Sequence, residues 1–294
     1  MNRDGQPHIA RISVARYLTQ AQMEAELAWL GLLAGRGLTV SSPVLSLRPR
    51  LYEHRRIDRI DYFLSVFTKA PGRKPERADL TKTFAHRLGE LIGKLHATAA
   101  WANASGMSFA RENWKESRLL THDLVTTSAP IGSRFRDSMH ELVGRIDALA
   151  VTPTTFGLIH GDVNSGNCHI ENEQVWLFDF DNCEHGYFVQ DLAVMLYDTL
   201  YSAFVKHVPA ETLVATILNL WQPLVTGYRV SGPRLTLGAD DLRNRFLLRE
   251  AALYIHYHRV FPAARLVKDD YVTGMRTRVA SLSHSLDFAA LADV

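Results

Sequence analysis

The chain has 294 residues, of which 47% are hydrophobic and 22% are charged. This balance is typical of a folded globular protein and excludes a disordered or coiled-coil chain. A formal charge of +2, from 33 Lys and Arg against 31 Asp and Glu, argues against a broad nucleic-acid or membrane-binding surface. No apolar run approaches the roughly 18 residues of a membrane span, and the N-terminus lacks the apolar core of a signal peptide, so we expect a cytoplasmic protein.

The first 68 residues combine short apolar runs with one helical pattern. A weak alternation follows the turn signal Asp4–Gly5 and indicates a strand. From Thr19 onward, apolar residues recur at helical spacing until a glycine ends the pattern. Strands are therefore predicted at 8–13, 44–47 and 62–67, with a helix from Thr19 to Gly35 or Gly37 and a basic separator before the last strand.

A composition shift at residues 69–75, which contain two prolines and a glycine, predicts a linker. The chain beyond it reads as mainly helical. Helices are predicted from Asp79 or Thr81 to His96 and at 134–149, 191–204, 211–225, 240–260 and 269–291. Residues 101–130 are mixed, with a Ser/Thr-rich turn near Thr126.

The stretch LIHGDVNSGNCHIENEQVWLFDFDNCEHGYFVQDL, at 158–192, concentrates acids, amides and glycines between apolar runs. Asp162 precedes Asn167 by five positions, and Asp179 follows an apolar strand predicted at 175–178. This is the layout of a phosphoryl-transfer centre, where one Asp orients the attacking hydroxyl while an Asn and a second Asp hold Mg²⁺. The alternative is a polar turn that contains these residues by chance, and the DFD triplet after an apolar strand argues against it.

Other polar residues of this stretch have less specific roles. His160 is better suited to brace the loop through a backbone carbonyl than to transfer a proton. Asp181 and Asp191 are supporting acids that either line an acceptor site or cap a helix. Cys168 and Cys183 lack the CxxC spacing of zinc sites and read as ordinary thiols that would face one another if the hairpin strands pair.

The motifs HGDVNSGN, FDFD and QDLAVMLY resemble those of the aminoglycoside phosphotransferase and choline kinase-like superfamily, and most closely its bacterial phosphotransferase-family or homoserine-kinase-like branch. The resemblance runs from about His8 to the helix predicted at 240–260. It implies an α+β, two-lobed protein-kinase-like fold. Residues 1–68 would form a small nucleotide-binding sheet lobe, and residues 69–294 a larger, mainly helical lobe for catalysis and substrate binding.

The resemblance also implies an activity, the transfer of a γ-phosphate from ATP or GTP, with Mg²⁺, to a hydroxyl of a small molecule. Amino alcohols, homoserine-like compounds, sugars and aminoglycosides are all open as acceptors. By position in the motifs, Asp162 matches the catalytic Asp, and Asn167 and Asp179 match the metal ligands. No nucleic-acid or membrane partner is expected, and the oligomeric state is left open.

The nucleotide-binding residues follow from the same resemblance. Arg11 falls where the family has its strand lysine or arginine, and Glu26 lies at the right distance along the chain to be its helix partner. Phe67 and Thr68 would border the adenine. Only ten residues precede Arg11, too few for the hairpin that usually covers the phosphates, so the first hairpin would be largely missing. A misassigned start, a natural truncation and a loss of catalysis are the competing explanations.

Three rival functions remain open on the sequence. One is a weak or inactive kinase-like nucleotide-binding scaffold, and another is a protein Ser/Thr kinase, although the segment between Asp179 and Asp191 is short for a protein substrate. A third is a metal-dependent hydrolase. The hydrolase would use His160, Asp162, His169, Asp179 and Asp181 as ligands. On the acceptor side, the candidate residues are Asp198, Arg243, Arg249 and His256.

Overall fold

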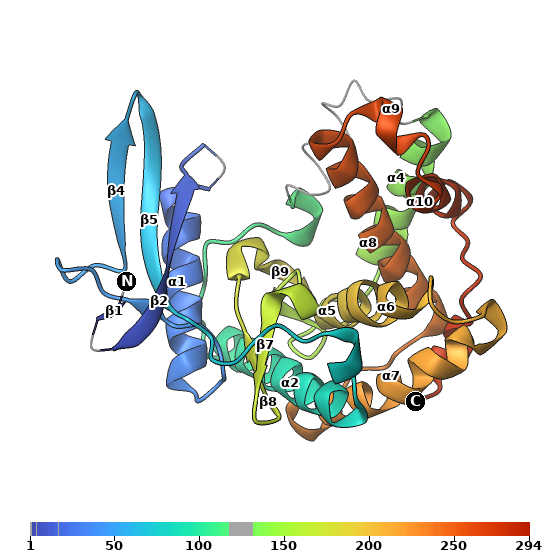
Figure 1. The fold of residues 1–294 in the computed structure, drawn as a ribbon, viewed down its shortest axis with the longest axis horizontal. Coiled ribbons are helices and arrows are strands. Elements are labelled where there is room, and N and C mark those ends of the chain that lie inside the picture. Colours follow the sequence, from blue (N-terminus) through green and yellow to red (C-terminus); the bar gives the residue numbers. More distant parts are fainter. Residues whose placement is uncertain (1, 4, 17, 118–131) are drawn as a thin grey trace.

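An antiparallel sheet and one helix build the start of the chain in the computed structural model, which describes residues 2–3, 5–16, 18–117 and 132–294 (Figure 1). The sheet has the order β1-β2-β5-β3, and β4 pairs with β5. Its elements are β1 (Asn2–Arg3), β2 (Gln6–Val14), α1 (Gln20–Gly35), β3 (Pro43–Val44), β4 (Tyr52–Ile57) and β5 (Ile60–Thr68). The strands predicted at 8–13 and 62–67 and the helix that begins after Thr19 are confirmed.

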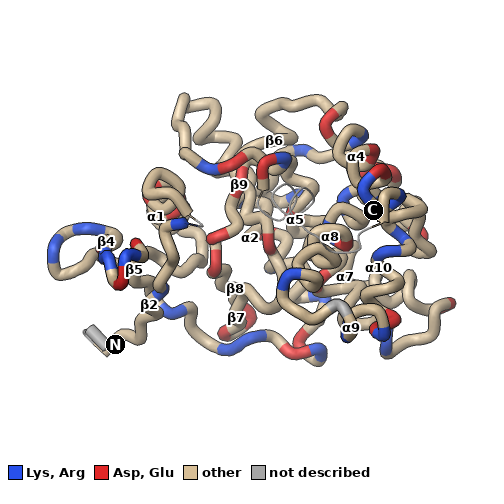
Figure 2. The backbone as a smooth tube through the Cα atoms, turned by 90° about the horizontal axis from the view of Figure 1, so that it is seen from above, with Lys and Arg blue, Asp and Glu red and all other residues tan. Residues whose placement is uncertain are grey.

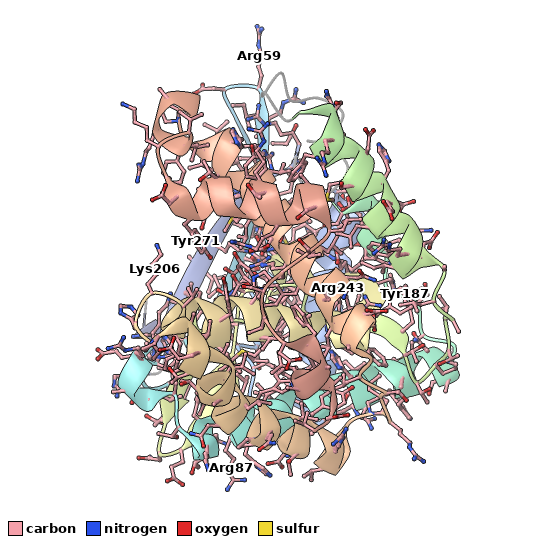
Figure 3. The ribbon with its side chains drawn as sticks, turned by 90° about the vertical axis from the view of Figure 1, so that its right-hand side faces the viewer. Arg59, Arg87, Tyr187, Lys206, Arg243 and Tyr271 are labelled. Atoms are coloured by element: carbon pink, nitrogen blue, oxygen red, sulfur yellow. The ribbon has the colours of Figure 1, made fainter. Side chains whose placement is uncertain are left out.

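The β4–β5 hairpin corrects the sequence prediction, which treated the basic residues before β5 as a separator. Asp58 and Arg59 have φ values of 48° and 66°, the conformation of a two-residue hairpin turn whose twist suits paired strands. Most β4 side chains are exposed, so this edge strand needs no apolar alternation and has no hydrophobic signature. Figures 2 and 3 show its basic residues, with Arg59 projecting from the tip.

The strand predicted at 44–47 is wrong in extent, because only Pro43–Val44 pairs with β5. Leu45 and Leu47 are 51% and 93% exposed. The apolar run that suggested a longer strand therefore has no core to pack against.

Helix α1 starts at a capping box in which the Gln22 backbone N–H donates to the Thr19 hydroxyl and the Gln22 side chain accepts from the Thr19 backbone. Its buried residues include Met23, Leu27 and Leu30. The predicted linker at 69–75 contains no helix or strand. It is nonetheless tied to the body of the protein, since Arg73 exchanges backbone hydrogen bonds with Ile170.

The remainder of the described chain is mainly helical and forms the second, larger lobe (Figure 1). Its helices are α2 (Lys82–Ala104), α4 (Ser133–Asp147), α5 (Phe188–Met195), α6 (Ser202–Phe204), α7 (Ala210–Ser231), α8 (Ala239–Val260), α9 (Ala263–Leu266), α10 (Asp270–Ser281) and α11 (Phe288–Ala292). The two-lobed α+β architecture is thereby confirmed, whereas the lobe boundary at residue 68 stays a prediction.

Helices α2 and α7 pack in close contact because glycines line their interface. A Cβ at Gly89 would collide with the Leu224 carbonyl oxygen, and one at Gly227 with the carbonyl oxygen of His86. Of the two starts predicted for α2, Asp79 and Thr81, the structure shows Thr81 as the N-cap. The helix continues two turns beyond the predicted end at His96.

Two helix predictions are wrong in detail. The helix expected at 191–204 begins at Phe188 and passes from α5 into a π-helical segment, Leu196–Tyr201, before α6. The helix expected at 269–291 is broken by Leu282, whose φ is 50°, so α10 and α11 are separate. The turn predicted near Thr126 lies outside the described residues.

Four short strands frame the central stretch: β6 (Phe156–Ile159), β7 (Cys168–Glu171), β8 (Gln174–Leu177) and β9 (Glu184–Tyr187). In the β7–β8 hairpin Cys168 stands opposite Leu177, so the idea that the two cysteines face one another is wrong. Both thiols are free and buried. No helix in the described ranges is long and apolar enough to cross a membrane.

Candidate active site

The loop that follows β6 is braced by His160, which is fully buried. Its Nδ1 accepts a hydrogen bond from the Asp162 backbone N–H at 3.3 Å, and its Nε2 donates to the Phe178 carbonyl at 3.1 Å. The ring also packs against Phe180 at 4.2 Å between centroids. His160 therefore joins the loop to the segment that carries Asp179, and both ring nitrogens are engaged in doing so.

Asp191, for which the sequence left two roles open, binds the backbone of the same loop. One carboxylate oxygen accepts from the His160 backbone N–H at 2.9 Å and from His96 Nε2 at 3.0 Å, while the other accepts from the Gly161 N–H at 2.9 Å. Burial would raise the pKa of Asp191, but the hydrogen bond and charge of His96 outweigh it, and the pKa is lowered. The Tyr228 hydroxyl, 3.1 Å from His96 Nδ1, completes this network.

Asp162 and Asn167 are joined directly. The Asn167 amide nitrogen lies 2.8 Å from Asp162 Oδ2 and 3.0 Å from the Asp162 carbonyl oxygen, and donates to both. The amide oxygen of Asn167 is thereby left as the atom that can bind a cation. Ser165 fixes the loop between them, since its backbone N–H donates to the Thr199 hydroxyl at 2.9 Å.

Arg249, on α8, clamps Asp162 from the other side. Its Nη2 lies 2.5 Å from Asp162 Oδ1, and its Nε lies 2.6 Å from Asp198 Oδ2. Burial lowers the pKa of Arg249, but the charges of Asp198 and Asp162 outweigh this and raise it. Burial also raises the pKa of Asp198, and the Arg249 charge offsets only part of that rise. The Arg249 guanidinium thus forms ion pairs with two carboxylates.

Arg11 and Glu26 form an ion pair of 2.7 Å between β2 and α1, and the Glu26 side chain is fully buried. Burial lowers the pKa of Arg11, but the hydrogen bond and charge of Glu26 outweigh it, so the pKa is raised. Within the described chain, Arg11 Nε and Glu26 Oε1 are buried without hydrogen-bond partners. Spare polar atoms at this pair suit a site that binds a further polar group.

A cavity of about 450 Å³ brings this pair together with residues from both lobes. Phe67 lines it and lies 4.9 Å beneath the Arg11 guanidinium. Thr68 does not line it, because its hydroxyl and N–H bind the backbone of Ser42. Ile9, Lys69 and Lys74, which sequence reasoning missed, also line it, as does His169, which the sequence suggested only as a ligand of the hydrolase alternative.

Asp179 lies in the same cavity in a left-handed conformation, with φ 67°. Burial and the charge of Asp181 raise its pKa, and Arg11 offsets only part of this. Two neighbouring carboxylates are suited to share a cation. In the described part of the chain no three His, Cys, Asp or Glu residues are grouped to hold a metal, so the five-ligand hydrolase site is not formed.

Arg111 is a site residue that no sequence signal indicated. It donates to the Cys183 carbonyl at 2.6 Å, to the Asp181 carbonyl at 2.5 Å and to the Gln22 carbonyl of α1 at 3.2 Å. It thus connects α1 of the first lobe to the segment from Asp181 to Cys183 of the second lobe. Two predicted acceptor-side residues are not brought to the site, since Arg243 pairs with Asp240 and His256 lies exposed on α8.

Comparison with known proteins gives a consistent result. The sequence signature of the phosphotransferase enzyme family matches residues 2–229. Amicoumacin kinase of Bacillus subtilis (strain 168) is 28% identical over 298 residues, covering 98% of this chain and 86% of the relative.

Two solved structures share the fold. That of amicoumacin kinase hAmiN, in complex with AMP-PNP, Ca²⁺ and Ami, has a TM-score of 0.86 at 24% identity and covers 98% of this chain and 86% of that one. That of a microcompartment-associated aminopropanol kinase has a TM-score of 0.67 at 18% identity and covers 95% of this chain and 84% of that one. The family resemblance is thereby confirmed: the chain belongs to the phosphotransferase enzyme family and is a kinase-type phosphotransferase.

Proposed function

We propose that this protein transfers the γ-phosphate of ATP, with Mg²⁺, to a hydroxyl of a small amino alcohol or a related compound. One observation carries the proposal. A single cavity is lined by Arg11, Glu26, Phe67 and Asp179, which come from four separate elements and which the sequence assigned to nucleotide and metal.

The cavity fits a nucleotide in size and chemistry. Its volume of about 450 Å³ lies in the range of small-molecule sites, which span roughly 300–1,000 Å³. Phe67 and Ile9 supply apolar surface for a base, while Arg11, Lys69 and Lys74 supply positive charge for phosphates. Arg11 Nε, buried and unpartnered among the described residues, is the donor that a phosphate oxygen would satisfy.

Asn167 and Asp179 would hold the metal, which supplies neutralisation of phosphate charge when bound. Their oxygens are the hard ligands that Mg²⁺ prefers. Burial and the charge of Asp181 raise the pKa of Asp179, and a bound cation would favour its charged form. Asp181 adds a second carboxylate nearby. GTP is a second candidate nucleotide.

Asp162 would orient the acceptor hydroxyl and take its proton. Asn167 on one side and Arg249 on the other fix the carboxylate, and such positioning is the main protein contribution to phosphoryl transfer. Arg249 against Asp162 and Asp198 leaves one net negative charge, which favours an acceptor that carries an amine. The name of the aminopropanol kinase with the same fold agrees with such an acceptor.

The test is Mg²⁺-dependent ADP release by the purified protein across amino alcohols, homoserine, sugars and aminoglycosides. The Asp162→Asn variant should lose at least about 10²-fold in kcat, because orientation and proton acceptance are removed together. Asp58→Asn, in the exposed β4–β5 turn, is the matched control and should keep full activity.

Two results would count against the proposal. Nucleotide binding with no turnover on any acceptor would favour a scaffold. ADP release that Asp162→Asn leaves intact would move the chemistry elsewhere in the protein.

A further inference from the structure

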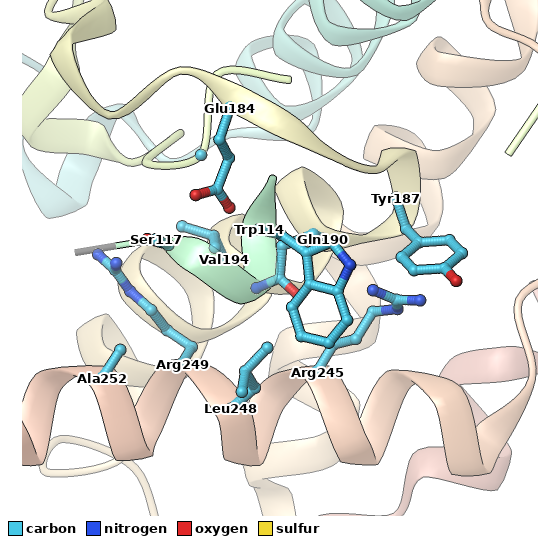
Figure 4. A pocket seen from close by; sticks show the side chains of 11 residues that line it. Trp114, Ser117, Glu184, Tyr187, Gln190, Val194, Arg245, Leu248, Arg249 and Ala252 are labelled. Atoms are coloured by element: carbon cyan, nitrogen blue, oxygen red, sulfur yellow. The ribbon is translucent and has the colours of Figure 1, made fainter. Parts of the chain in front are cut away.

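A second, smaller pocket lies between α5, α8 and β9 and reaches the catalytic loop at Gly161 (Figure 4). Its volume is about 40 Å³, which is roughly three times the ~10–15 Å³ that one water needs. It therefore holds a group of about three heavy atoms rather than a whole acceptor. Its apolar walls are Trp114, Val194, Leu248 and Ala252.

Arg245 brings an unsatisfied donor to this pocket. Its side chain is 1% exposed and its Nε donates to Asp241 at 2.7 Å, while its guanidinium lies 4.4 Å over the ring of Tyr187. Nη2 is buried and has no hydrogen-bond partner among the described residues. A guanidinium N–H has no acceptor capacity, so only an oxygen or similar acceptor can satisfy it.

Gln190, on α5, brings the complementary atom. It is 9% exposed and lines the same pocket, and its Oε1 is buried without a partner in the described chain. Figure 4 shows that Gln190 and Arg245 come from two different helices and that the Arg245 guanidinium extends toward the ring of Tyr187. Two buried atoms of the pocket therefore lack partners among the described residues: Arg245 Nη2 needs a hydrogen-bond acceptor, and Gln190 Oε1 needs a donor.

The pocket offers little net charge to an ion. Asp241 neutralises Arg245, and Arg249 is held by Asp162 and Asp198. Burial raises the pKa of Glu184, which also lines the pocket, to about 8. This shift reduces the negative charge of the Glu184 carboxyl near neutral pH, and together with the paired arginines it suits a neutral group.

We propose that this pocket binds a carboxamide group of the substrate that receives the phosphate. The carbonyl oxygen of the carboxamide accepts a hydrogen bond from Arg245, and its N–H donates one to Gln190. An ammonium would leave Arg245 unsatisfied, and a carboxylate would set an oxygen against Gln190 Oε1. A lone hydroxyl would leave most of the volume empty. The inference rests on the proposed function, which places the acceptor beside Asp162.

The test uses four probes that share an amino alcohol: ethanolamine, L-serine methyl ester, L-serinamide and L-serine. Dissociation constants come from ligand-observed NMR, which suits weak fragments and needs no turnover. The wild-type protein should bind the amide at least tenfold more tightly than ethanolamine, about 1.4 kcal/mol, with the ester between them and serine weaker than the amide.

Two variants separate the two contacts. Gln190→Met should abolish the preference for amide over ester, and Arg245→Met the preference for ester over ethanolamine. Gln222→Met, at an exposed position of α7, and Arg243→Met, on α8, are controls that should keep both preferences. Thermal unfolding of each variant confirms that it is folded, and because Gln190 makes no ion pair its variant tests the proposal even if Arg245→Met unfolds.

Equal affinity for all four probes, no detectable amide binding, or an amide preference that survives in both variants would overturn the inference. Turnover separates it from the kinase proposal. ADP release without amide preference leaves the proposed function standing and removes the subsite, whereas amide preference without ADP release on any acceptor does the reverse.

Discussion

Replacing Arg249 by methionine should damage both stability and catalysis, because this side chain is shared by two carboxylates. The Arg249 side chain is 9% exposed, and those of Asp162 and Asp198 are 19% and 16% exposed. Removing one partner of a buried ion pair costs about 3–5 kcal/mol. Since both carboxylates retain some solvent contact, we expect the lower end, about 3 kcal/mol, and a fall in Tm of roughly 6–12 °C.

The catalytic effect follows from position. With Arg249 gone, the Asn167 amide is the remaining hydrogen-bond donor to the Asp162 carboxylate among the described residues. A shift of about 1 Å in a catalytic group can cost ~10²-fold in kcat. Arg249→Lys should be intermediate, because an ammonium is a point charge that cannot make both contacts of the guanidinium. The measurements are thermal and urea unfolding, together with kcat and KM for ADP release.

Arg243→Met is the matched control on the same helix. Arg243 pairs with Asp240, whose side chain is 82% exposed, and such pairs contribute about 0–1 kcal/mol. The reasoning fails if the free energy of unfolding of Arg249→Met lies within about 1 kcal/mol of that of the wild type and its kcat within about threefold. The contacts of Arg249 with Asp162 and Asp198 would then have no energetic role.

Three further predictions follow from other buried groups. Asp191→Asn places an amide N–H against backbone donors and should cost about 3 kcal/mol in urea unfolding; a loss under 1 kcal/mol would refute the brace. Arg11→Met should destabilise the protein and raise the nucleotide Kd, whereas the double variant Arg11→Met/Glu26→Gln should recover stability but not nucleotide affinity; recovery of both would reduce the pair to a structural role. Glu184 holds a proton in the folded protein between its ordinary pKa of 4.5 and about 8, so its contribution to stability is greatest below pH 4.5 and is lost as pH rises to about 8. The urea midpoint of unfolding of Glu184→Gln should therefore be higher than that of the wild type at pH 8 and similar to it at pH 4. Urea midpoints that change with pH in parallel for the two proteins would contradict this.

Sequence patterns predicted the helical lobe well because its helices bury one apolar face. They failed where structure depends on exposed residues. Strand β4 carries HisArgArg on an open edge, and only the two-residue turn at Asp58–Arg59 signals it. The break at Leu282 depends on a single left-handed residue that no glycine marks.

The candidate site shows the same division. Asp162, Asn167 and Asp179 are predicted as site residues because they lie in one short stretch with fixed spacing. The contacts that hold this segment come from distant residues: Arg249 binds Asp162 from 87 positions away, His96 binds Asp191 from 95 positions away, and Arg111 binds the Asp181 carbonyl from 70 positions away. Spacing carries no information about such contacts, so the sequence allows a prediction of the site residues but not of the side chains that hold them in place.

The two buried thiols can report on the motion of the candidate catalytic segment. Cys168 directly follows Asn167, Cys183 lies two residues after Asp181, and burial raises the pKa of each thiol to about 12. Thiol reagents attack the thiolate, so labelling in the folded protein requires local opening of the segment. Labelling rates at the two positions, resolved by mass spectrometry, would therefore measure how often each flank of the site opens, and how far nucleotide closes it, without any engineered probe.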